Sequence, residues 1–329
     1  MLTLRENFIE TVKGGHPDRF VNQYAYMGRI TDPIGKDCNA MCARGSRRVN
    51  AWGATIVWPE ALPGPFPIHD EEHIVLKDIT QWKQVLRRPD PRAYPEELWK
   101  QTLEEVEKAK REGKFVTCSV TPGILERVIM LMSISEGLMA FLEEPEAARE
   151  LVDFLADWEI ECAQETLRHY QPEILFHHDD WGSQKSLLMS VPTFEAFLLP
   201  AYKKIYGFWK DNGVQYVIHH SDSYAAELVP HMIEMGVDIW QGAVSENDLP
   251  ELIRKYGDRI TFQAGLDNGK YDTPNWSREA IREGLEDLFR SCGTAHLIPS
   301  LTQGGPGSAF PGVYDTVSEV IDELSAKYF

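Results

Sequence analysis

Two stretches of the sequence end an apolar run with a cluster of imidazoles and carboxylates. The first, residues 173–180, reads EILFHHDD, and the second, residues 216–223, reads YVIHHSDS. Each predicts a short β-strand whose last residues are polar. In parallel α/β proteins the carboxyl ends of the strands form the active-site face, so chemistry is expected at such strand ends. We therefore predict that the two strand ends face one pocket.

His220 and Asp222 lie two residues apart at the second strand end. Alternate strand residues point the same way, and imidazole and carboxylate are both good zinc ligands, so the pair suits a divalent ion. The same pair also suits a general base oriented by a carboxylate. In a third reading, Asp222 caps the following helix. We take metal binding as the working prediction, with His220 and Asp222 as ligands.

His178 and Asp180 have the same spacing at the first strand end, with His177 and Asp179 facing the other way. Two such pairs in one pocket supply enough ligands for a zinc site. Adjacent carboxylates raise one another's pKa, so the pocket needs a cation or a shared proton. We expect Asp179 to cap or brace the nearby Gly182-Ser183. The predicted catalytic residues are His178, Asp180, His220 and Asp222.

Other strand ends carry polar side chains that would meet at the same face, namely Gln241, Gln263 with Asp267, and Ser300 with Gln303. Aromatic residues of the N-terminal part suit a flat or apolar substrate, although each also suits an ordinary core. Glu126 begins a helix above another strand end and is a further candidate. The predicted substrate contacts are Tyr24, Tyr26, Trp52, Trp181, Gln184, Gln263 and Asp267.

The elements that must position these residues alternate between helix and strand from residue 96 onward. Six strands are predicted near residues 117, 175, 217, 239, 262 and 297, a seventh over residues 19–26, and an eighth in the loop-rich N-terminal third or beside Ser133. We predict one (β/α)8 TIM barrel over residues 1–329, with an open doubly wound sheet as the alternative. Residues 1–95 would form an N-terminal helix, the first strand and a Gly/Pro-rich excursion, either a lid or a surface decoration.

Composition narrows the classes of partner. The 329 residues include 33 Lys plus Arg against 51 Asp plus Glu, a net charge of −18 that disfavours nucleic acid and anionic membranes. The sequence has no apolar run long enough for a membrane span and no secretory signal pattern, so we expect a cytoplasmic protein. Five scattered cysteines suit reduced thiols. Cys38 and Cys42 lack a second Cys/His pair, which favours a loop over a metal site.

At the polar strand ends the chain resembles the uroporphyrinogen decarboxylase superfamily, and within it the cobalamin-dependent methyltransferase branch. The matching stretches are residues 79–83 (ITQWK), 178–184 (HDDWGSQ), 217–222 (VIHHSD), 235–238 (MGVD) and 262–267 (FQAGLD). The resemblance implies a (β/α)8 barrel with its ligand at the carboxyl-terminal strand ends.

The sequence departs from the family patterns at two places. Decarboxylases of this family carry a segment resembling W-x-M-R-Q-A-G-R for a polyacid, whereas residues 24–29 read YAYMGR with one arginine. The methyltransferases carry H-x-C and a later cysteine as zinc ligands, whereas here His220-Ser221-Asp222 replaces H-x-C and no cysteine lies near Ser300. Thiolate-rich zinc suits thiol activation, so these losses argue against a thiol methyl acceptor. An oxygen-rich ligand set suits Lewis-acid activation of an ether or alcohol oxygen.

These features predict a methyltransferase that moves a methyl group from a small methoxylated, aromatic compound to the Co(I) corrinoid of a partner protein, the first step of O-demethylation. The implied cofactors are that corrinoid and a divalent metal, with Zn as first choice. One alternative is a corrinoid-free decarboxylase or lyase of the same fold that acts on a small carboxylate. Another is a non-catalytic ligand-binding subunit. A homodimer is one candidate for the oligomeric state.

Overall fold

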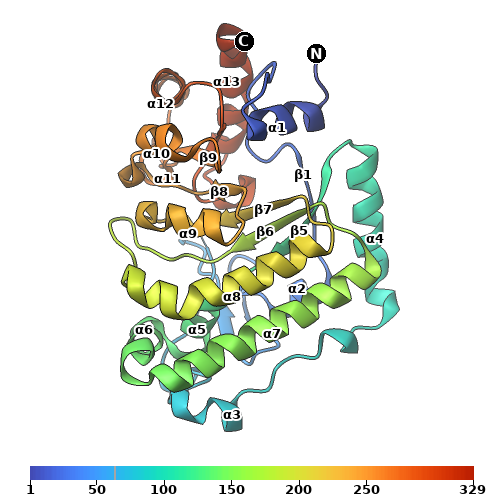
Figure 1. Ribbon diagram of the computed structural model, residues 1–329, viewed down its shortest axis with the longest axis vertical. Helices are drawn as coiled ribbons and strands as arrows, with labels where there is room; N and C mark the ends of the chain where they lie inside the picture. Colours follow the sequence, from blue (N-terminus) through green and yellow to red (C-terminus); the bar gives the residue numbers. More distant parts are fainter. Residues whose placement is uncertain (63) are drawn as a thin grey trace.

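The computed structural model describes residues 1–62 and 64–329. Its main sheet is parallel and curled, with the strand order β1-β5-β6-β7-β8-β9-β10 (Figure 1). The strand bounds are β1 (Met27–Ile30), β5 (Phe115–Val120), β6 (Ile174–His178), β7 (Tyr216–His220), β8 (Ile239–Gln241), β9 (Thr261–Leu266) and β10 (Leu297–Leu301). Sequential order around a curled parallel sheet is the arrangement of a TIM-barrel-like α/β fold, not of an open doubly wound sheet.

Helices connect successive strands and cover the outside of the sheet. They are α4 (Glu96–Arg111), α5 (Ile124–Met132), α6 (Ile134–Glu143), α7 (Pro145–His169), α8 (Val191–Asp211), η3 (Ala226–Leu228), α9 (Val229–Glu234), η4 (Ser245–Asn247), α10 (Leu249–Tyr256), α11 (Asn268–Tyr271), α12 (Arg278–Cys292), η5 (Pro306–Ser308) and α13 (Val313–Tyr328). The two longest, α7 and α8, run side by side across the lower half of the view (Figure 1). In the described residues no helix is both long and apolar enough to span a membrane.

The amino-terminal end of the barrel is closed by α1 (Leu4–Lys13), an amphipathic helix that begins with a capping box at Thr3. Its Phe8 is fully buried among the inward-facing side chains of the strands. Arg5 donates to the carbonyl of Lys114 at 3.2 Å and pairs with Glu173, so the helix lies against the residues just before β5 and β6. The opposite end of the barrel stays available for a ligand.

The first strand is shorter and later than the sequence prediction of residues 19–26, because residues 23–26 form turns and β1 begins at Met27. Gln23, at φ 45°, donates its backbone N–H to the carbonyl of Pro299 at 3.2 Å, and its side-chain oxygen accepts from the N–H of Leu301. This turn segment therefore lies against β10. Among the described residues the main sheet has seven strands, and the eighth strand expected from the sequence is not one of them.

Residues before α4 include a second, small sheet. Three short antiparallel strands pair in the order β2 (Arg47–Val49), β3 (Thr55–Val57) and β4 (Phe66–Pro67). Around them lie α2 (Pro33–Cys38), η1 (Ile79–Gln81), α3 (Trp82–Val85) and η2 (Pro91–Ala93). Trp52 and Trp82 anchor this region by packing against Trp158 and Phe154 of α7.

Strand alternation divides the core into two parts. The inward residues of β5 to β8, such as Phe115, Ile174, Ile218 and Ile239, fill the barrel, while the outward residues pack under the helices. β6 and β7 pair in direct register, with His177 opposite His219 and His178 opposite His220. The register therefore sorts four histidines into one inward and one outward pair.

Candidate active site

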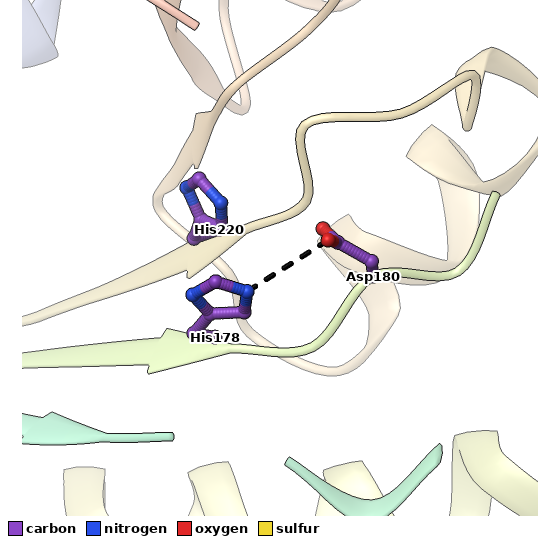
Figure 2. Close-up of side chains that lie close together, drawn as sticks. All are labelled: His178, Asp180 and His220. Carbon is purple, nitrogen blue, oxygen red and sulfur yellow. Dashed lines mark ion pairs between the residues drawn. The ribbon is translucent and has the colours of Figure 1, made fainter. Parts of the chain in front are cut away.

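Two imidazoles face each other at the carboxyl-terminal ends of β6 and β7, inside the barrel. The ring centroids of His178 and His220 are 4.2 Å apart. Figure 2 shows the two rings projecting from adjacent strand ends, with Asp180 approaching from the chain that follows β6. This is the convergence predicted from the two polar strand ends.

His178, Asp180 and His220 form a cluster with metal-ligand geometry. One nitrogen or oxygen atom of each lies within 4.8 Å of the others. His178 Nε2 is 3.7 Å from Asp180 Oδ2. Ligand bonds of about 2.0–2.2 Å in a tetrahedral zinc site place ligand atoms roughly 3.3–3.6 Å apart, so this spacing fits a divalent ion after small adjustments. We call these three residues the HDH cluster.

Two more carboxylates border the HDH cluster. Glu126, in the first turn of α5, places Oε2 3.5 Å from His178 Nε2. Asp222 donates its backbone N–H to Asp180 Oδ1 at 3.0 Å. Asp180, one of the predicted catalytic residues, is therefore the carboxylate of the cluster, and Asp222 lies beside it. The ligand role of Asp222 stays a prediction.

The pKa values of the three HDH residues shift in different directions. Burial opposes a charge on His178, but the nearby Glu126 and Asp180 raise its pKa well above the usual value. Burial likewise opposes the Asp180 charge, but hydrogen bonding and attraction to His178 lower the pKa of that carboxyl. Burial and the His178 charge lower the pKa of His220 to about 3. In the metal-free site His178 thus carries a positive charge next to Asp180, while His220 is a neutral imidazole. A divalent ion would take the place of the His178 proton, because only neutral imidazole binds metals.

The pKa values of the two bordering carboxyls move upward. Burial raises the pKa of Glu126 to about 7, against the opposing effect of His178. Burial and the adjacent Asp180 charge raise the pKa of Asp222 well above its usual value. Groups with such perturbed pKa values, gathered in one cleft, are typical of functional sites.

The outward partners of the cluster residues hold the strand ends in place. Asp179 is fully buried and caps α5 by accepting from the N–H groups of Leu125 and Glu126 at 3.0 and 2.7 Å. It was expected to brace Gly182-Ser183, and the helix it caps is instead the one that carries Glu126. Gly123 allows this approach, since a Cβ there would lie 2.5 Å from the Cβ of Asp179.

His178 and His220 of the HDH cluster line a cavity of about 450 Å³, whose lining does not include Asp180, Glu126 or Asp222. Tyr24 and Phe176 contribute aromatic walls, and the Arg29 guanidinium lies 4.5 Å from the Phe176 ring centroid. The cavity continues past the end of β5 toward α7. Its lining includes Asn39 and Met41 from the N-terminal region and Gln303 from the chain after β10. Of the predicted substrate contacts, Tyr24 lines it.

The remaining predicted contacts lie elsewhere. Tyr26 is fully buried below the cavity and donates its hydroxyl to Gln263 Oε1 at 2.6 Å. Trp52 packs on Trp158, and Trp181 stacks on His219 outside the barrel at 3.7 Å between centroids. Two further candidates were Gln184, which is exposed and reaches the carbonyl of Asp222 at 3.4 Å, and Asp267, which caps α11. None of these lines the cavity, so their substrate roles stay predictions.

Sequence reasoning gave Arg29 no role and Glu126 only a minor one. Arg29 follows Met27 by two residues in β1, so strand alternation would have placed it inward once the strand was located correctly. Glu126 reaches the site because a buried aspartate from another strand caps its helix. Such a tertiary cap leaves no short-range signal in the sequence.

The HDH donor set suits a divalent metal. Two imidazoles and a carboxylate bind Zn²⁺ and other first-row divalent ions, and with three protein ligands a coordination position remains for substrate or water. Thiolates are excluded from this set, because the metal-ligand cluster found among the described residues contains no cysteine. Cys38 lies elsewhere on the cavity lining, and burial raises the pKa of its thiol to about 11.

Fold and site together define a TIM-barrel-like protein with a polar, metal-competent pocket at its carboxyl-terminal strand ends. Residues 53–299 match the profile of the uroporphyrinogen decarboxylase (URO-D) family. The chain therefore belongs to the uroporphyrinogen decarboxylase family, as the sequence resemblance implied at superfamily level. No curated protein matches the sequence significantly.

Comparison with solved structures supports the fold. A methyltransferase from Methanosarcina mazei superimposes with a TM-score of 0.64 and 15% sequence identity, over 98% of this chain and 99% of that one. At that identity the likeness concerns the fold. A sugar phosphate isomerase/epimerase from Parabacteroides distasonis has a TM-score of 0.33 and 14% identity, over 68% of this chain and 80% of that one. This score is too low to carry an argument.

Proposed function

We propose that the protein is a methyltransferase that takes a methyl group from the oxygen of a small methoxylated, aromatic compound and passes it to the Co(I) corrinoid of a partner protein. The observation that carries this proposal is the HDH cluster, which contains no thiolate and whose two imidazoles line the cavity. Family membership and the methyltransferase fold neighbour support an enzyme of methyltransferase or decarboxylase type. The oxygen-rich donor set favours oxygen as the atom to be activated.

The reaction breaks one carbon–oxygen bond and forms one cobalt–carbon bond. Nucleophilic Co(I) supplies both electrons of the new bond and becomes methyl-Co(III), while the ether oxygen keeps the pair of the broken bond. A divalent ion held by His178, Asp180 and His220 would act as a Lewis acid toward that oxygen. The remaining task for the protein is to stabilise and protonate the leaving phenolate or alkoxide.

Glu126 is placed to supply the proton. Its carboxyl borders the HDH cluster, and in the metal-free protein burial raises its pKa to about 7, so that a large fraction is protonated at neutral pH. A general acid with a pKa near the working pH combines availability with driving force. The buried cap at Asp179 fixes the start of the helix that carries Glu126.

The cavity supplies binding and orientation. Tyr24 and Phe176 suit the face of an aromatic ring, and Arg29 above Phe176 suits a negative substituent on that ring. Asn39 and Met41 bring the N-terminal excursion into the lining, which supports a substrate-binding role for it. We propose that the corrinoid protein delivers its cofactor at this end of the barrel.

Arg29 also favours a second candidate function. It makes no ion pair with the described residues, although the chain is strongly acidic. A cation at the cavity suits a substrate carboxylate and thus a decarboxylase or lyase that acts on a small carboxylate without corrinoid. The other arginine on the cavity lining, Arg127, lies 4.0 Å from Glu159. Arg29 alone is left for a substrate carboxylate, which suits a monoacid better than a tetrapyrrole polyacid.

Reaction with a corrinoid protein tests the proposal. Purified protein would be mixed with a Co(I) corrinoid protein and a panel of methoxyarenes, and conversion of the Co(I) spectrum to that of methyl-Co(III) would be followed. We expect conversion with at least one methoxyarene and none with its demethylated analogue. If no methoxylated compound alkylates cobalt, the methyl-transfer proposal fails. Release of CO₂ from a small aromatic acid would establish the second candidate.

A further inference from the structure

Gln241 links one imidazole of the HDH cluster to the end of β10. It is the last residue of β8, points inward and is fully buried. Its side-chain Nε2 donates to the carbonyl of Thr302 at 2.9 Å and, more weakly, to that of Leu301 at 3.4 Å. Its Oε1 contacts Nδ1 of His220. One amide thus contacts two backbone carbonyls and one imidazole nitrogen.

These contacts fix the orientation of the amide. Backbone carbonyls only accept hydrogen bonds, so the amide NH₂ group must face Thr302 and Leu301. The carbonyl oxygen of Gln241 must then face His220, and it too can only accept. His220 therefore carries its proton on Nδ1, and Nε2 keeps a free lone pair.

We infer that Gln241 is a positioning residue that selects the Nδ1–H tautomer of His220 and so presents Nε2 as the metal-binding atom. The bond also fixes the plane of the ring relative to His178. Hydrogen bonds from the non-ligating nitrogen of a metal-binding histidine commonly serve both purposes. The inference rests on the metal site of the proposed function and is independent of which group the enzyme transfers.

A neighbouring residue of the same type provides a matched control. Gln263 lies directly opposite Gln241 in the register of β8 and β9 and is equally buried. Its amide accepts from the hydroxyl of Tyr26 and donates to the backbone carbonyl of Gln23 at 3.3 Å. Neither bond involves an imidazole. Substituting either glutamine removes buried hydrogen bonds. Substituting Gln241 also removes the acceptor that holds the proton of His220 on Nδ1.

The test combines a tautomer measurement with metal affinity in the full-length protein. Two-bond ¹H–¹⁵N correlation spectra of the metal-free protein distinguish the two histidine tautomers, and the signal lost in His220→Asn assigns His220. Zn²⁺ affinity would be measured by competition with a chromophoric chelator for wild type, Gln241→Leu, Gln241→Glu and Gln263→Leu. Circular dichroism would check folding of each variant.

We expect the Nδ1–H tautomer in wild type and its loss in Gln241→Leu, with Zn²⁺ binding weakened by about 10- to 100-fold. Gln241→Glu keeps an acceptor toward Nδ1 and is expected to keep the tautomer, even if Gln241→Leu does not fold. Gln263→Leu should leave the tautomer and the Zn²⁺ affinity unchanged. An Nε2–H tautomer in wild type, or equal Zn²⁺ losses in both leucine variants, would overturn the inference. Failure of methyl transfer alone would leave it standing.

Discussion

The four histidines at the ends of β6 and β7 form two pairs that differ in their surroundings. His177 and His219 point outward, where His219 bonds to the Tyr206 hydroxyl at 2.8 Å and the Asp179 carbonyl at 3.0 Å, and His177 bonds to Glu159 at 3.0 Å. His178 and His220 point into the barrel and border a cavity. Residues of the same type, adjacent in the chain, thus pack among helices on one face of the sheet and border the proposed metal site on the other.

The difference follows from what each face offers. Outward imidazoles lie under α7 and α8, where tyrosines, a glutamate and Trp181 surround them. Both ring nitrogens of His219 are engaged, so it has no lone pair left for a ligand. Inward imidazoles have acidic neighbours and open space. A pair of histidines in a strand therefore indicates a functional site only when it is known which of them points into the barrel.

Removing an inward imidazole should have the largest effect. His220→Ala removes one of the three HDH ligands. Loss of a residue that only orients a ligand typically weakens metal binding by about 10- to 100-fold, so the loss of Zn²⁺ affinity in His220→Ala should be larger. Methyl transfer should become undetectable while the fold stays intact. Metal content of protein purified without chelator and a thermal melt measure the two effects. Full metal content in His220→Ala would remove the ligand assignment.

Glu126→Gln should lower kcat by about 10²- to 10⁴-fold, the usual contribution of a general acid. The acid is active when protonated, so wild-type activity should fall as the pH rises through the pKa of Glu126. Burial raises this pKa to about 7 in the metal-free protein, and a bound divalent ion would lower it. The glutamine variant should lack this decline. A pH–rate profile of both proteins measures the difference, and an identical alkaline limb in both would exclude Glu126 as the acid.

Removing an outward imidazole should affect stability and leave metal binding intact. His219→Ala deletes a buried ring, its two hydrogen bonds and its stacking on Trp181, which should lower the free energy of unfolding by about 2–5 kcal/mol. Urea unfolding measures the loss, and Zn²⁺ competition serves as the control. A His219→Ala protein of wild-type stability with weakened metal binding would reverse the comparison.

His219 of the outward pair should also give the protein a pH-dependent stability. Burial lowers the pKa of His219 well below its usual value. Between the folded and unfolded pKa values the unfolded chain binds the extra proton, so stability should fall as the pH drops below about 6.5. The slope from this group approaches about 1.4 kcal/mol per pH unit. Urea unfolding between pH 6.5 and 5 measures the slope of the unfolding free energy against pH, which should be smaller in His219→Gln than in wild type. An unchanged slope would show that other groups cause the pH dependence.

Strand alternation made much of the fold and the cluster predictable. The repeated pattern of helix and strand after residue 96 predicted a parallel barrel, and the i, i+2 spacing correctly placed His178 with Asp180 inward and His177 with Asp179 outward. The facing of a strand residue depends only on the period of the strand, which is local information.

Other features depend on contacts that are distant in the sequence. The first strand was predicted too early in the chain. Residues 24–26 (YAY) are rich in aromatic side chains, as strands often are, but residues 23–26 form turns that lie against β10. Trp52 and Trp181 lie in the outer core because α7 and α8 offer them partners there. That Asp180 lies closer to the two imidazoles than Asp222 follows from the path of the chain after each strand, which residue spacing alone does not determine.

The central claim is that a thiolate-free pair of inward imidazoles and a carboxylate hold a metal. X-ray absorption spectroscopy of the Zn²⁺-loaded protein tests it most directly, because Zn–S bonds of about 2.3 Å are resolved from Zn–N and Zn–O bonds of about 2.0–2.2 Å. We predict a first shell of nitrogen and oxygen only, with two imidazoles in wild type and one in His220→Ala. A sulfur shell, or a spectrum unchanged by that substitution, would contradict the account.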